Sequence, residues 1–170
     1  MKKILFTWML MLVAALAVHA QSLTGKQWCT VLNDEDGTGI AVALTFEKRG
    51  TCEILIAAQQ DLEEDGVPIN LVAGVTVPGT YKRDGNDLNT RFNNGKAKVD
   101  VDYEIKGMDA KTKSMLDKEI KGEISSLKKE FRQVLLEGMP KMDHLRIVSL
   151  DSQRLVVKNE DDQEIPFYAE

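Results

Sequence analysis

The segment AKVDVDYEIK, residues 97–106, decides the predicted fold. Its apolar or small side chains alternate strictly with charged ones. Successive side chains of a β-strand point to opposite faces, so this alternation predicts a strand with one face buried and the other in water. One-sided burial is typical of antiparallel sheets. The side chains expected on the buried face are Ala97, Val99, Val101, Tyr103 and Ile105.

Weaker alternation on both sides of this segment predicts further strands. Residues 39–46 and 51–58 place large apolar side chains at every second position, and the short Gly-containing link between them predicts a hairpin. Residues 67–81 contain Pro68 and Pro78, which predicts an edge or bent strand because proline cannot donate to a ladder. The other predicted strands cover residues 28–32, 88–92, 145–150, 154–158 and 164–168, for a total of about eight or nine.

The hydrophobic period changes between residues 109 and 137. Apolar side chains recur there at spacings of 4, 4, 3, 4 and 4 residues, which predicts one stripe of an amphipathic α-helix. Gly138 and Pro140 are typical of a helix end. The chain therefore inserts one long helix before its last three strands. The stripe consists of Leu116, Ile120, Ile124, Leu127, Phe131 and Leu135.

These elements predict a mainly β protein, either an antiparallel up-and-down β-barrel or a strongly curved sheet. Closing the sheet removes its exposed edges, which favours the barrel. About eight strands enclose an interior that is either filled by side chains or holds one small ligand, and the sequence leaves both open. The candidate contacts for such a ligand are Trp28, Val42, Leu44, Phe46, Ile54, Val99, Val101, Tyr103 and Ile105.

The first twenty residues predict a secretory signal peptide. A basic start precedes an apolar run over residues 4–18, and small residues follow at the positions that a signal peptidase reads. The run is shorter than the roughly 20 apolar residues that span a bilayer. Cleavage after Ala20 would leave residues 21–170 as a single domain, periplasmic or secreted, with no later segment expected to cross a membrane.

Two cysteines, Cys29 and Cys52, fall in the part of the chain expected to be exported, where a disulfide is chemically allowed. The alternation of side chains along a strand works against a bridge. If Trp28 points into the core, its neighbour Cys29 points out, whereas Cys52 shares a face with Ile54 and Ile56. The sequence therefore leaves two alternatives, a bridge or two separate thiols packed as small apolar groups.

No motif predicts a catalytic, metal or cofactor site. His144 is the only histidine after residue 20, and no Gly-x-Ser-x-Gly element accompanies it. One histidine and two distant cysteines do not form a zinc site, and the acidic turn of residues 33–39 lacks the first and last ligands of an EF-hand. A net charge of −5 and a pI near 5.2 disfavour nucleic-acid binding. We therefore expect no enzyme.

Three groups of residues carry a family resemblance: an opening strand with glycine and tryptophan, strands joined by Gly, Asn and Asp turns, and a closing apolar pair. They are Leu23-Thr24-Gly25-Lys26-Gln27-Trp28, Gly79-Thr80-Tyr81-Lys82 through Asp84-Gly85-Asn86, and Leu155-Val156-Val157 with Ile165-Pro166-Phe167. This pattern resembles lipocalin-like exported proteins of Bacteroidetes bacteria, over nearly all of residues 21–170 apart from the helix. The resemblance implies a small up-and-down β-barrel or a strongly curved sheet, and with it ligand binding.

Two functions from different classes remain as hypotheses. In the first, the barrel holds a small apolar molecule and the helix acts as its lid. In the second, the barrel is filled, and the protein is a non-enzymatic scaffold that binds an envelope protein through its helix. The helix can pack on its own barrel, cap one mouth, or bind a partner; the residues that would do so are Leu116, Ile120 and Phe131.

Overall fold

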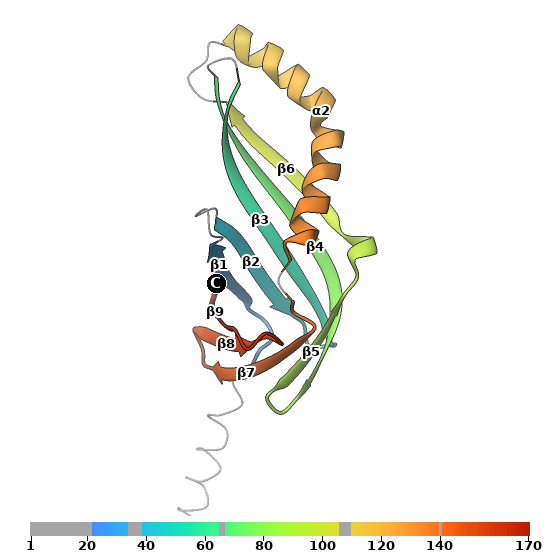
Figure 1. Cartoon of the computed structure of the whole chain (residues 1–170), viewed down its shortest axis with the longest axis vertical. Helices are drawn as coiled ribbons and strands as arrows, with labels where there is room; N and C mark the ends of the chain where they lie inside the picture. The colour runs from blue at the N-terminus through green and yellow to red at the C-terminus, as the bar shows by residue number, and fades with distance from the viewer. Residues whose placement is uncertain (1–21, 34–38, 65–66, 106–109, 140) are drawn as a thin grey trace, which may run out of the picture.

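A computed structural model describes residues 22–33, 39–64, 67–105, 110–139 and 141–170. The predicted signal peptide lies outside the described residues. Nine strands form one antiparallel sheet, and one long helix precedes the last three strands (Figure 1). The elements are β1 (Gln27–Asn33), β2 (Gly39–Phe46), β3 (Thr51–Glu64), β4 (Val67–Asp84), β5 (Asp87–Phe92), η1 (Asn94–Lys96), β6 (Lys98–Ile105), α2 (Ala110–Glu137), β7 (His144–Leu150), β8 (Arg154–Lys158) and β9 (Glu164–Ala169).

Eight of the nine strands close into an up-and-down barrel, which confirms the predicted fold class. Each strand pairs with the next along the chain, except that β5 pairs with β7 and leaves β6 outside the barrel. The ring closes where β9 meets β1, with Trp28 opposite Ala169 and Cys29 opposite Tyr168. Closure removes the free edges that an open sheet would expose.

Three strands form what we call the arm: β3 and β4 continue past the barrel, and β6 pairs with β4 beside them. The β3–β4 ladder runs from Thr51↔Thr80 to Glu64↔Val67, whereas β2 reaches along β3 only as far as Ala58. β6 pairs with β4 from Ile69↔Ile105 to Thr76↔Lys98 and forms the third strand of the arm. Figure 1 shows β3, β4 and β6 rising together from the barrel.

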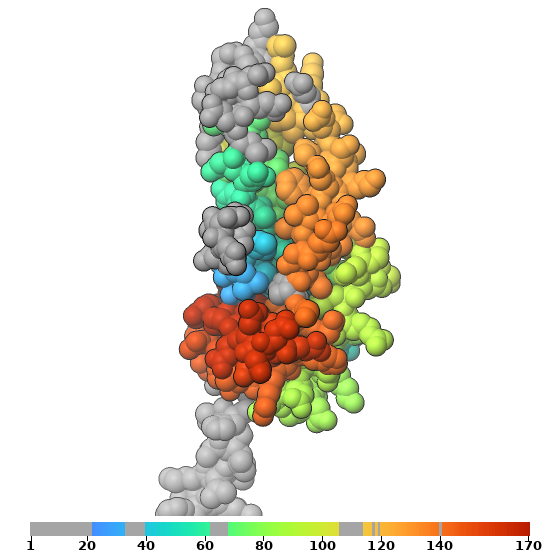
Figure 2. Space-filling view, in the orientation of Figure 1, coloured from blue at the N-terminus to red at the C-terminus, as the bar shows by residue number. Residues whose placement is uncertain are grey.

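The helix α2 covers the apolar face of the arm. Leu116 and Ile120 pack with Tyr103 against the buried pair Ile69 and Ile105, and Figure 2 shows α2 along the flank of the arm. The helix thus supplies apolar cover where no strand closes the sheet. The predicted partner face of α2 is therefore in contact with its own sheet.

The end of α2 meets the barrel. Phe131 and Leu135 pack against the barrel core, and Leu135 is buried. The Arg132 guanidinium donates a 2.6 Å hydrogen bond to the carbonyl oxygen of Asn94 in η1. These contacts fix the last turns of the helix beside the β5–β6 connection. Among the described residues, we find no helix with the length and apolarity needed to cross a membrane.

Side chains fill the barrel interior. Trp28, Phe46 and Phe167 are completely buried, and the Trp28 indole donates a 2.9 Å hydrogen bond to the carbonyl oxygen of Leu23. Removing such apolar surface from water is the main stabilising term of the fold. The other large side chains that are completely or almost completely buried are Leu44, Ile54, Ile56, Leu88, Met142, Leu155, Val42, Val75 and Val77.

One part of the predicted barrel lining is wrong. Val99, Val101, Tyr103 and Ile105 lie on β6, outside the closed ring, and face the same side of the arm as α2. The physical reason is that β5 and β6 occupy successive stretches of one edge of β4, separated by η1. The barrel continues from β5 to β7, so β6 has no place in the ring. The other predicted lining residues, Trp28, Val42, Leu44, Phe46 and Ile54, belong to the barrel core.

Candidate functional site

The outside of the barrel has two walls of different chemistry. The outward side chains of β4, β5, β7 and β8 form a polar wall, as expected for a surface in water. Apolar outward side chains of β9, β1, β2 and β3 gather into what we call the apolar wall, with the polar side chains of Gln27, Thr45, Glu53 and Glu164 on the same face around it. The polar wall consists of Thr80, Lys82, Asn89, Arg91, His144, Arg146 and Lys158, and the apolar wall of Cys29, Val31, Ala41, Ala43, Leu55, Ala57, Pro166 and Tyr168.

Cross-strand register brings small residues together on the apolar wall. Val31 lies opposite Ala41, Ala41 opposite Ala57, and Ala57 opposite Gly74. Side chains in such a row share one face of the sheet. Because three of these four residues have no side chain or only a methyl group, the row forms a low strip between larger neighbours.

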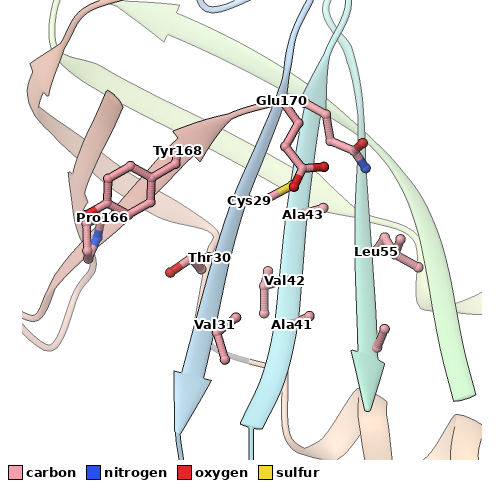
Figure 3. Close-up of a pocket in the computed structure, with 12 residues that line it drawn as sticks. Cys29, Thr30, Val31, Ala41, Val42, Ala43, Leu55, Pro166, Tyr168 and Glu170 are labelled. Atoms are coloured by element: carbon pink, nitrogen blue, oxygen red, sulfur yellow. The ribbon is translucent and has the colours of Figure 1, made fainter. Parts of the chain in front are cut away.

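Val31, Ala41 and Ala57 of this strip line a hollow of about 800 Å³ on the outer surface. Figure 3 shows Pro166 and Tyr168 of β9 on one side, Leu55 of β3 on the other, and the alanines of β2 between them. The hollow is open to water, since the side chain of Val31 is 62% exposed and that of Tyr168 is 54% exposed. A contiguous apolar surface of this kind is typical of an interaction site.

One charged group, Glu170, lines the hollow. Its carboxylate accepts a hydrogen bond from the Cys29 thiol, and the two side chains meet at one end of the hollow in Figure 3. Partial burial raises the pKa of Cys29, and the negative charge of Glu170 and this hydrogen bond raise the pKa further. The thiol therefore stays protonated at neutral pH, which is the opposite of what a nucleophilic cysteine requires.

The second cysteine lies on the other face of the wall. Cys52 is buried in the barrel core, and burial raises the pKa of its thiol to about 12. Both cysteines are free. The alternative of a Cys29–Cys52 bridge is therefore wrong in this structure, for the reason of strand parity: one thiol points outward and the other inward.

His144 lies on the polar wall, in a shallow hollow of about 420 Å³. Its Nδ1 is 2.6 Å from the side-chain oxygen of Asn89, and its Nε2 is 3.8 Å from the Glu160 carboxylate. Both ring nitrogens thus face oxygen acceptors rather than a nucleophile that the ring could activate. In the described parts of the chain, no cluster of three or more histidine, cysteine or acidic side chains could hold a metal ion.

Comparison of the chain with protein-family models and with curated protein sequences gives no match. The site is therefore interpreted from its own geometry.

Sequence reasoning missed the apolar wall, because it treated every second position as solvated. The signal was present in two stretches that are apolar at successive positions: Ile40-Ala41-Val42-Ala43-Leu44 and Ile54-Leu55-Ile56-Ala57-Ala58. Strands that are apolar on both faces are typical of strands buried on both sides. Here one of those faces is only partly covered by the described residues: Ala43 is buried, whereas Ala41 is exposed.

Proposed function

We propose that this protein is an exported, non-enzymatic interaction protein that binds a partner through its apolar wall. The observation that carries the proposal is an apolar hollow of about 800 Å³ on the outside of a barrel whose interior side chains are tightly packed. In a barrel of this size the outward side chains normally face water and are polar. An apolar outer wall is costly in water unless another surface covers it.

The filled core favours this proposal over a ligand inside the barrel. Large side chains such as Trp28, Phe46 and Phe167 occupy the space that a ligand would need. The helix stripe is also a weaker candidate, because Leu116 and Ile120 already pack on the arm. The apolar wall is the remaining large apolar surface of the described chain that its own elements do not cover.

A protein segment suits the hollow better than a small molecule. The volume lies within the range of small-molecule sites, but such sites usually enclose most of the ligand surface. An open hollow between Val31 and Tyr168 would leave much of a small ligand in water. A partner protein can cover both the floor and the rim.

The proposal includes export from the cytosol and a relationship to lipocalin-like proteins. The amino-terminal segment has the composition of a signal peptide, so we expect the partner in the periplasm, at the envelope or outside the cell. The up-and-down strand order is compatible with lipocalin-like ancestry, but strand order alone supports a fold and not a ligand.

Site-specific photocross-linking in the native host tests the proposed function. A photoreactive amino acid at Val31, an exposed position of the apolar wall, should give one discrete cross-linked product. The Ala41→Arg substitution in the same hollow should remove that product. The control position is Lys82 on the polar wall. Equal products from both positions, or none from Val31, would contradict the proposal.

A further inference from the structure

We propose that the occupant of the apolar wall is a basic amphipathic helix of the partner protein, with its apolar side chains on the alanine floor and a lysine or arginine at Glu170. This inference rests on the proposed function and adds the chemistry of the partner. Three features of the hollow carry it: its width, its floor and its charge.

The width matches one helix. The hollow extends across four adjacent strands, β9, β1, β2 and β3. Neighbouring strands lie about 4.8 Å apart, so the distance from Tyr168 on β9 to Leu55 on β3 is about 14 Å. A helix with its side chains is about 10–12 Å across. The two larger side chains can therefore flank a single helix.

The floor permits close approach. Ala41, Ala43 and Ala57 line the hollow and present only methyl groups. Large apolar side chains of a partner can thus reach the sheet surface. Helices that dock into grooves insert such side chains at three- and four-residue spacing.

The charge favours a basic partner. Among the described residues, Glu170 is the only charged one that lines the hollow. Its carboxylate is hydrogen-bonded to the Cys29 thiol, and no described cation forms an ion pair with it. A carboxylate at the edge of an apolar surface that becomes buried needs a cationic or hydrogen-bonding partner.

Charged side chains of both signs lie around the hollow. The exposed Glu53 lies two residues before the lining residue Leu55 on β3, and the exposed Asp100 lies opposite Gly74, one strand beyond Ala57. Arg154 lies directly opposite the lining residue Tyr168. With a net charge of −5 over the whole chain, the field favours approach of a basic segment.

The same charges disfavour two other occupants. In a symmetric pair of identical chains, each surface would bring its own Glu170 to the interface, and neither would supply a lining cation to pair with it. An anionic lipid surface would be repelled by the same carboxylate. A second copy of this chain is accordingly an outcome that would overturn the proposal.

A pair of labelled peptides tests the charge preference on the purified protein. Both have about 18 residues, which is five helical turns, with leucine and phenylalanine on one face; one has lysine and the other glutamate at every polar position. Fluorescence anisotropy should show that the lysine peptide binds more than about tenfold tighter. Glu170→Gln should weaken its binding about two- to fivefold.

Matched substitutions locate the binding. Ala41→Arg fills the floor and adds one positive charge, and it should abolish binding of the lysine peptide. Thr80→Arg adds the same charge on the polar wall and should leave binding within about twofold. Equal affinity for both peptides, or an equal effect of the two arginine substitutions, would overturn the proposal.

The cross-link at Val31 separates this inference from the proposed function. If the cross-linked segment, identified by mass spectrometry, is basic and amphipathic, both stand. If it is a neutral or acidic segment, the interaction role stands and the basic helix is wrong. If it belongs to a second copy of this chain, the basic helix is also wrong. If no product forms at Val31, the apolar wall is not a docking surface, and both proposals fall.

Discussion

Cys29 and Cys52 lie on opposite faces of the barrel wall, although only β2 separates their strands. Cys29 on β1 is opposite Ala43, and Cys52 on β3 is opposite Phe46. Ala43 and Phe46 are three residues apart on β2, an odd interval, so their side chains point to opposite faces. The two thiols therefore have different surroundings: an open hollow with a carboxylate for Cys29, and an apolar core for Cys52.

The two thiols should react with a thiol reagent in separate steps. We expect Cys29 to react slowly in the folded protein, because partial burial, and then the charge and hydrogen bond of Glu170, raise the pKa of its thiol. We expect Cys52 to react only after unfolding. Glu170→Gln removes the charge, lowers the pKa of Cys29 and should speed the first step at pH 8. Time-resolved alkylation with mass spectrometry measures both rates. An unchanged first step in Glu170→Gln, or a protein without free thiols, would contradict this prediction.

Burial of Cys52 should make the protein less stable in alkaline solution. The pKa of this thiol is about 12 in the folded chain, against 9.0 for an ordinary thiol. The folded state therefore retains a proton that the unfolded state loses, so stability is full below pH 9 and is lost as the pH rises from 9 towards 12. The slope from one such group is about 1.4 kcal/mol per pH unit.

Urea unfolding of the parent protein and of Cys52→Ala, between pH 8 and pH 11, isolates this contribution. Other groups titrate in the same range, but they are common to both proteins. The difference in unfolding free energy between the two should shrink at high pH. A constant difference would mean that Cys52 ionises in the folded protein as readily as in the unfolded one.

Local sequence patterns were sufficient to predict the strands and the helix, but they did not predict which strands pair with one another in the sheet. The alternation in residues 97–106 predicted the strand β6, and the spacing from Leu116 to Leu135 predicted α2. Neither pattern contains information on which edge a strand joins. β5 and β6 share one edge of β4. This arrangement depends on the η1 turn between them, and on the pairing of β5 with β7, a strand more than 50 residues away in the sequence.

The apolar wall could not be predicted from the sequence for a related reason. The periodicity argument assigns one face of a strand to the core and the other to water. Ala41 and Ala57 are small enough to be accepted on a solvated face, so neither residue alone signals a site. Only the register that aligns Val31, Ala41, Ala57 and Gly74 makes them one surface.

Trp28→Phe should destabilise the barrel. Trp28 is completely buried, and its indole nitrogen donates to the carbonyl oxygen of Leu23. Phenylalanine removes this donor and leaves a gap in the core, so we expect a loss of about 2–4 kcal/mol in unfolding free energy. Val148→Ala, at a position that is 51% exposed, is the control and should change stability by less than about 0.5 kcal/mol. Equal effects in chemical denaturation would mean that Trp28 is not a core anchor.

Phe131→Ala distinguishes a packing role of the α2 stripe from a binding role. Phe131 is half-buried against the barrel core, whereas Val134, one turn away in sequence, is 59% exposed. Because the stripe packs on its own chain, Phe131→Ala should lower the unfolding free energy by about 1–3 kcal/mol and Val134→Ala by less than about 0.5 kcal/mol. The cross-link at Val31 should persist in both variants under folding conditions. If Phe131→Ala instead left stability unchanged and removed the cross-linked product, the helix stripe would be the docking surface in place of the apolar wall.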